Sequence, residues 1–232
     1  MHKAHVLTGV AFVAVSAAAA HPTPTTFLLA ATSVPGFALF PDIDHPKSMV
    51  SSTYGWFTSL FSLLLGHRRE THSFPGIAAF GLVTWAATLW PNFVVSKVWL
   101  TVLLVLCWAS LLRAFKIKGR DADLLPWLVA IPIVWYRPEL VKAGIAPYPL
   151  WFIPVALVLG MLLHVWGDCL TKFGCPLWWP FSKRRTMLRF KLRPSGKVRY
   201  LKTNSKFEHR VVVPLLWVVS IGSTLLWVSD LV

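Results

Sequence analysis

The chain has 232 residues, of which 56% are hydrophobic and 14% are charged, a balance that excludes an ordinary soluble domain. Its net charge of +14 does not indicate a nucleic-acid-binding protein, because eleven basic residues lie in one segment, Lys183–Arg210. Such clustering is typical of a loop on the cytoplasmic side of a membrane. We therefore expect a single all-α integral membrane domain over residues 1–232, without a nucleic-acid partner.

Apolar runs divide the chain into candidate membrane helices. They lie at Val6–Ala20, Phe27–Phe40, Phe74–Val95, Val98–Leu112, Leu124–Tyr136, Pro149–Leu163 and Val211–Ser229. Several are shorter than the roughly 20 residues that cross a bilayer. Their helices must therefore include flanking residues, or they enter the bilayer without crossing it. The pattern predicts a polytopic helical bundle with about seven spans.

The distribution of lysine and arginine predicts the orientation of this bundle. If the N-terminus is inside and all seven runs cross, only Lys97, Arg137 and Lys142 face outward, and the other twenty of the twenty-three basic residues face inward. This asymmetry agrees with the positive-inside rule. A second interpretation makes Met1–Ala20 a cleaved signal peptide, which would leave the remaining topology unchanged but would remove His5.

The first chemical motif, Pro41–Pro46, follows the second apolar run. The two prolines predict an extended or turned backbone, in which Asp42 and Asp44 point the same way and His45 follows them. A solvated loop is the alternative, but acids at a helix C-terminus oppose the helix dipole. We favour metal ligands.

The second motif, His67–Ser73, precedes the third run. His67 and His72 are five residues apart, which does not suit one helical face and instead predicts a loop that leads into a helix. Thr71 or Ser73 could cap that helix, with Pro75 in its first turn. Arg68 could bind a phosphate through its planar guanidinium. A positively charged membrane anchor with incidental histidines remains an equal alternative.

The third motif closes the sixth run with His164 and Asp168. Their spacing of four places both side chains on one helical face, where they could share an ion or form a simple hydrogen-bonded pair. With the N-terminus inside and seven runs that cross, this motif lies on the same membrane face as the other two. His5 lies at that face as well. Glu208, the one acid within 183–210, would be a partner of the site or a counter-ion to nearby arginines.

The basic segment 183–210 has a pattern of its own. Apolar and basic residues partly alternate in Met187–Lys202, around the turn-forming Pro194–Lys197. This pattern predicts a β-hairpin-like cytoplasmic loop with a cationic edge, suited to an anionic lipid head group.

Taken together, these motifs resemble those of a known family. The stretches PDIDHPKS, HRRETHS and HVWGDCLTKFGCPLWWPFSKRR, with the basic stretch before Glu208, are similar to the YdjM-type family of inner-membrane metal-dependent hydrolases, some of whose members carry a LexA-binding label. The family's middle motif is typically HRGxTHS, whereas Arg69 replaces the glycine here. The resemblance also extends, more distantly, to the zinc-dependent phospholipase C and nuclease group.

The resemblance implies a metal site and a location. The implied metal ligands are His5, Asp42, Asp44, His45, His67, His72, His164 and Asp168. We expect zinc, with manganese or iron as alternatives, in an inner-membrane protein whose site faces the cytoplasm.

From these observations we expect hydrolysis of a phosphoester in a lipid or lipid-linked substrate, with Asp44, Arg68 and Glu208 as catalytic residues. The alternative is a membrane scaffold or regulator in which the metal is structural and the basic loop recruits a cytoplasmic protein. A transporter is less consistent with the sequence, because no charged relay crosses the apolar runs.

Overall fold

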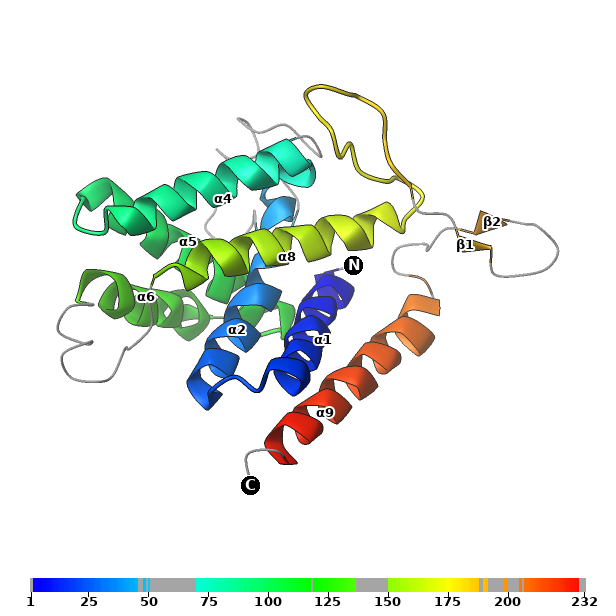
Figure 1. The fold of residues 1–232 in the computed structure, drawn as a ribbon, viewed down its shortest axis with the longest axis horizontal. Helices are drawn as coiled ribbons and strands as arrows, with labels where there is room; N and C mark the ends of the chain where they lie inside the picture. The colour runs from blue at the N-terminus through cyan, green and yellow to red at the C-terminus, as the bar shows by residue number, and fades with distance from the viewer. Residues whose placement is uncertain are drawn as a thin grey trace.

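The computed structural model describes residues 2–45, 48, 50, 70–117, 119–136, 150–187, 190–191, 198–199, 205 and 207–229. Apart from one pair of two-residue strands, the regular elements of this part of the chain are helices (Figure 1). The α-helices are α1 (His2–Ala20), α2 (Pro24–Phe37), α4 (Phe74–Leu89), α5 (Val94–Ala114), α6 (Arg120–Trp135), α8 (Phe152–Cys169) and α9 (Val213–Ser229). Three short helices accompany them: η1 (Phe40–Asp44), η2 (Glu70–His72) and η3 (Glu208–Val212).

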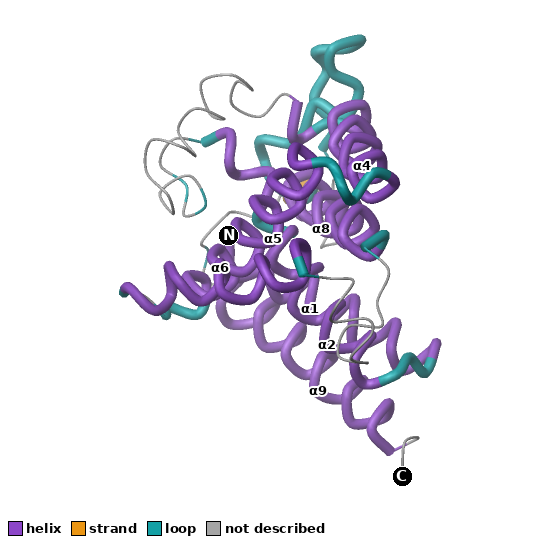
Figure 2. The backbone as a smooth tube through the Cα atoms, turned by 90° about the vertical axis from the view of Figure 1, so that its left-hand side faces the viewer, coloured by secondary structure: helices purple, strands orange, loops and turns teal. Residues whose placement is uncertain are grey.

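The helices form a bundle in which α1, α2 and α8 adjoin one another. α1 packs against α2 on one side and α9 on the other, and α8 packs against α2 and α4. Figure 2 shows α9 along the border of the bundle, with α4 and α8 together in another part of it. The core between these helices consists of large apolar side chains such as Phe37, Leu104, Leu157 and Met161. This packing brings the start of α1, the end of α2 and the end of α8 together.

A glycine allows the closest approach of α8 to α2. A Cβ atom on Gly160 would lie 2.7 Å from the backbone nitrogen of Ala38 and 2.7 Å from the carbonyl carbon of Phe37. Real Cβ atoms do not tolerate such distances, so only glycine fits at this crossing. His164 follows one helical turn later on the same face and is therefore held against the end of α2.

Each of the seven predicted apolar runs corresponds to a helix. Four stretches of the described chain are long and apolar enough to cross a membrane: Pro24–Asp44, Val94–Ala114, Phe152–Cys169 and Glu208–Ser229. Three helices contain shorter apolar stretches, at 4–20, 74–89 and 122–135. The helical bundle is thus confirmed, whereas seven complete crossings remain a prediction.

The predicted boundary between the third and fourth runs is wrong. α4 ends at Leu89 and α5 already begins at Val94, so Lys97 lies in the first turn of a helix and not in a loop. The reason is Pro91, which disfavours helical backbone at Trp90 and starts the turn between the two helices.

The basic loop contains one antiparallel strand pair, β1 (Phe190–Lys191) with β2 (Val198–Arg199). Phe190 pairs with Arg199, and Lys191 pairs with Val198, which agrees with the predicted direction of the two strands. The turn at Pro194–Lys197 lies outside the described residues, so the complete hairpin remains a prediction.

Candidate metal centre

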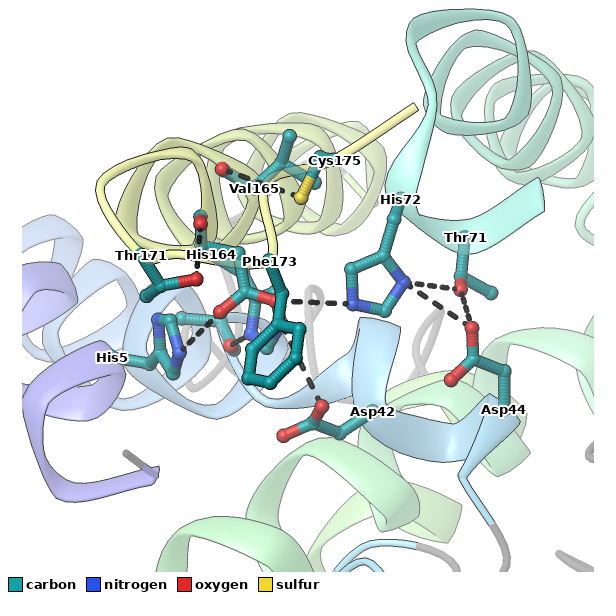
Figure 3. A network of polar contacts seen from close by, with 12 residues as sticks. His5, Asp42, Asp44, Thr71, His72, His164, Val165, Thr171, Phe173 and Cys175 are labelled. Atoms are coloured by element: carbon teal, nitrogen blue, oxygen red, sulfur yellow. Dashed lines mark hydrogen bonds and ion pairs between the residues drawn. The ribbon is translucent and has the colours of Figure 1, made fainter. Parts of the chain in front are cut away.

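Five histidine and aspartate side chains meet at one end of the bundle (Figure 3). Each arrives from the end of a helix: His5 from the start of α1, Asp42 from η1 after α2, His72 from η2 before α4, and His164 and Asp168 from the last turns of α8. All five except Asp42 are buried, and the Asp42 side chain is 32% exposed. Asp42 therefore lies where solvent reaches the group.

The His164 ring is held by a backbone carbonyl. Its Nδ1 lies 2.7 Å from the carbonyl oxygen of Ala38, which can only accept a hydrogen bond. Nδ1 must then carry the proton, and Nε2 is left with a lone pair. That Nε2 is buried without a hydrogen-bond partner in the described structure. This is the arrangement by which proteins prepare a histidine to bind a metal.

His72 is held in the same way by a carboxylate. Its Nδ1 lies 3.2 Å from Oδ2 of Asp44, and Thr71 Oγ1 donates a 2.6 Å hydrogen bond to the same oxygen. A proton on Nδ1 of His72 would again leave a lone pair on Nε2, which is buried and has no hydrogen-bond partner among the described residues. Asp44 thus orients the His72 ring through Nδ1, on the side of the ring opposite Nε2.

The helix that follows fixes the position of η2. Ser73 Oγ accepts a hydrogen bond from the backbone N–H of Gly76 at 3.1 Å, so Ser73 caps α4 as predicted, with Pro75 in the first turn. Ser73 Oγ also donates to the carbonyl of Glu70 at 3.0 Å. Because these bonds tie η2 to the start of α4, His72 has little freedom to leave the group.

Asp168 lies at the centre of the group and contacts three histidines. Its Oδ1 is 3.3 Å from His5 Nε2, and its Oδ2 is 3.7 Å from His72 Nε2 and 3.8 Å from His164 Nε2. His5 stacks on His164, with ring centroids 4.0 Å apart. His164 and Asp168 therefore share one face of α8 as predicted, but at 3.8 Å they do not form a hydrogen bond.

The spacing of these atoms suits a metal ion. Two combinations, His5 with His164 and Asp168, and Asp42 with His72 and His164, have ligand atoms that all lie within 4.8 Å of one another. Asp42 Oδ1 is 3.7 Å from His164 Nε2. Ligand atoms bound to one zinc ion at 2.0–2.2 Å lie roughly 3.3–3.6 Å apart in tetrahedral geometry, so the most distant of these atoms would approach one another by about 1 Å on binding. Imidazole and carboxylate ligands together fit a divalent metal ion.

The charges around the group also favour a cation. The buried Asp168 lies in the last turn of α8, where the helix dipole is negative, and the buried Asp44 adds a second carboxylate behind His72. Carboxylates so deeply placed are costly unless positive charge compensates them. A divalent cation would supply that charge.

Comparisons with known proteins agree with this architecture. The family model described as "YdjM inner membrane protein" matches residues 1–228. The chain belongs to this family. It is 28% identical over 142 residues to "Inner membrane protein YdjM" of Escherichia coli (strain K12), and equally to the protein of that name from Shigella flexneri. That match spans 61% of this chain but only 44% of the relatives' length. No solved structure matches the chain.

The structure of this YdjM family member corrects one local expectation. The backbone at Asp42 and Asp44 is a 3₁₀ helix and not extended, because Pro41 occupies a first-turn position that needs no N–H donor. Residues two apart in such a helix point roughly 240° apart, so the two carboxylates diverge. Asp42 reaches His164, whereas Asp44 reaches the far side of His72.

The remaining predicted residues lie elsewhere. The half-buried His45 follows η1, and the buried Glu208 begins η3; within the described residues, neither belongs to the two ligand combinations. His67 and Arg68 lie outside the described residues, so their predicted roles are not tested.

Sequence reasoning missed two contributors to the group. Thr71 was considered only as a helix cap, yet it is buried and donates to Asp44. A Cβ atom on Gly167 would lie 2.9 Å from both Cε1 and Nδ1 of the His5 ring, so this glycine leaves room for the histidine. The sequence offers one signal for these two residues: Thr71 directly precedes His72, and Gly167 directly precedes Asp168.

Proposed function

We propose that this protein is a metal-dependent hydrolase that cleaves a phosphoester of a lipid or lipid-linked substrate at the cytoplasmic membrane interface. The observation that carries the proposal is the convergence of the unbonded Nε2 atoms of His72 and His164 on the Asp168 carboxylate. Two histidines with their other ring nitrogens fixed, next to a carboxylate, form a donor set typical of hydrolytic metal sites.

The residues have distinct roles in this proposal. His72, His164, Asp168 and Asp42 would hold a divalent cation, zinc being the first choice, and His5 would hold Oδ1 of Asp168 or a second ion. Such a cation supplies Lewis acidity and a water nucleophile at neutral pH. Asp42 is the partly exposed member, so substrate would approach from its side, where its carboxylate could also accept a proton from water.

The position of the group supports a lipid substrate. Asp42, His164 and Asp168 lie near the ends of two stretches of membrane-spanning length, Pro24–Asp44 and Phe152–Cys169. The end of a membrane span is the level of a phospholipid phosphate. The exposed Trp178 and Phe181, beside the basic residues Arg184 and Arg185, suit the interface between apolar and charged layers. A phospholipid or an isoprenoid phosphate would present its phosphoester there.

The test is turnover by purified, zinc-loaded protein on a phospholipid, an isoprenoid phosphate and a water-soluble nitrophenyl phosphate. We expect hydrolysis of a lipid phosphoester that is lost in His164→Gln and Asp168→Asn and retained in His21→Asn. His21 lies at the other end of α1 and has a positive φ of 45°, which asparagine tolerates. Bound zinc without turnover of any of these esters would refute the hydrolase and favour the scaffold or regulator.

A further inference from the structure

A cavity of about 240 Å³ lies between α1, α5 and α9, apart from the candidate metal centre. Its lining comprises Val6 and Leu7 of α1, Ala114 to Lys116 at the end of α5, and Val213 and Trp217 of α9. Leu7 lies roughly 200° around α1 from His5, so the cavity and the metal centre are on opposite sides of this helix. A molecule in the cavity would be separate from a substrate at the metal.

The lining is apolar at depth and amphipathic at the rim. Val6, Leu7 and Ala114 are buried, whereas Phe115, Lys116 and Trp217 are exposed. Lys116 follows the end of the apolar helix α5, a position typical of the level of lipid head groups, and Trp217 lies in the second turn of α9. The cavity is smaller than the roughly 300–1,000 Å³ of sites that enclose a small molecule, so it would hold only part of its ligand.

The surroundings identify that ligand as a lipid. The cavity adjoins α9, whose apolar side chains, among them Leu215 and Val218, are mostly exposed and would face the membrane. A chain that entered the cavity could continue along this surface, as a soluble metabolite could not. The cavity therefore suits one hydrocarbon chain of a membrane lipid.

Lys116 adds a preference for negative charge. Lys116 has a φ of +64°. The Ile117 N–H donates to the Leu112 carbonyl at 3.0 Å, and the Lys116 N–H donates to the Arg113 carbonyl at 2.9 Å. These two hydrogen bonds close the helix in the way that usually has glycine at the position of Lys116. A lysine is thus present where the backbone favours glycine. Arg113 is paired with Asp123 at 2.7 Å, whereas Lys116 has no acidic partner among the described residues.

We propose that this cavity binds an anionic phospholipid, with one acyl chain between α1, α5 and α9 and the phosphate beside Lys116. The site does not depend on the proposed hydrolysis, because α1 separates it from the metal centre. It would be an accessory lipid site that supports the helix carrying His5.

The test is native mass spectrometry of the full-length protein in mild detergent, titrated with phosphatidylglycerol or with phosphatidylcholine of the same chains. We expect one retained phosphatidylglycerol, bound roughly fivefold more tightly than phosphatidylcholine, which is the contribution of one lysine near an anionic head group. Lys116→Gly suits the backbone and should abolish the preference but keep chain binding. Arg120→Gln removes an exposed cation from the same end of the bundle, outside the lining, and should change nothing.

A second variant tests the chain site. Val213→Trp fills the cavity and should remove binding of both lipids while zinc content stays normal, which also reports that the protein is folded. The proposal is overturned if Val213→Trp protein with normal zinc retains the bound lipid, or if Lys116→Gly retains the preference for phosphatidylglycerol.

Discussion

The carboxylate of Asp44 lies 3.2 Å from Nδ1 of His72, on the side of the ring that faces away from Asp168. Asp44 is therefore placed to hold the ring and not to touch an ion bound by Nε2. Histidine ligands commonly donate their other N–H to such a carboxylate, which fixes the tautomer and strengthens the ligand. Asp44 and Asp168 should then affect metal binding to different degrees.

Replacing Asp44 with alanine should weaken zinc binding without abolishing it. Loss of such an orienting partner typically lowers metal affinity about 10–100-fold, and Asp44→Asn should have a smaller effect because its amide oxygen still accepts a hydrogen bond. Competition with a chromogenic zinc chelator would measure both affinities. Asp123→Ala, in the ion pair with Arg113, is the control and should bind zinc normally. A loss as complete as that of Asp168→Ala would instead make Asp44 a ligand.

The pair Gly167→Ala and Gly222→Ala tests the position of His5. A new Cβ at residue 167 would lie 2.9 Å from the His5 ring and must displace it, whereas a Cβ at residue 222 meets nothing within 4 Å. Alanine otherwise favours a helix by up to about 1 kcal/mol over glycine. We expect Gly167→Ala to reduce the amount of bound zinc, and Gly222→Ala to leave it unchanged with equal or higher thermal stability. Equal zinc content in the two variants would show that His5 is not needed.

The sequence predicted which histidines and aspartates come together better than it predicted their arrangement. The spacing of His164 and Asp168 correctly predicted that they share a helical face. Both lie in one helix, and the regular geometry of a helix fixes which residues share a face. The divergence of Asp42 from Asp44 depends on the 3₁₀ helix that begins beside Pro41, whereas the two prolines predicted a non-helical, extended or turned backbone there. The contact of His72 with Asp44 joins η2 to η1, and no local pattern encodes such a tertiary contact.

Labelling of single cysteines tests the predicted seven crossings. The three native cysteines are buried, so they would first be replaced. Asn92 lies in the exposed turn between α4 and α5, and Arg184 is exposed in the loop after α8. With seven spans and the N-terminus inside, an impermeant maleimide should label Asn92→Cys in intact cells and Arg184→Cys only after the membrane is opened. Labelling of both in intact cells would show that fewer helices cross between these positions.

Removal of metal should destabilise the bundle, because the buried Asp168 would lose the charge that compensates it and the two fixed histidines would lose the bond to Nε2. A ligand that binds only the folded state at 100 times its Kd contributes about 2.7 kcal/mol to the free energy of unfolding. We therefore expect a chelator to lower the thermal midpoint of the detergent-solubilised protein, and zinc to restore it. His164→Gln should have a low midpoint that neither treatment changes, whereas His21→Asn should respond as the parent protein does. A chelator-insensitive midpoint in protein that initially contains zinc would place the ion outside this group.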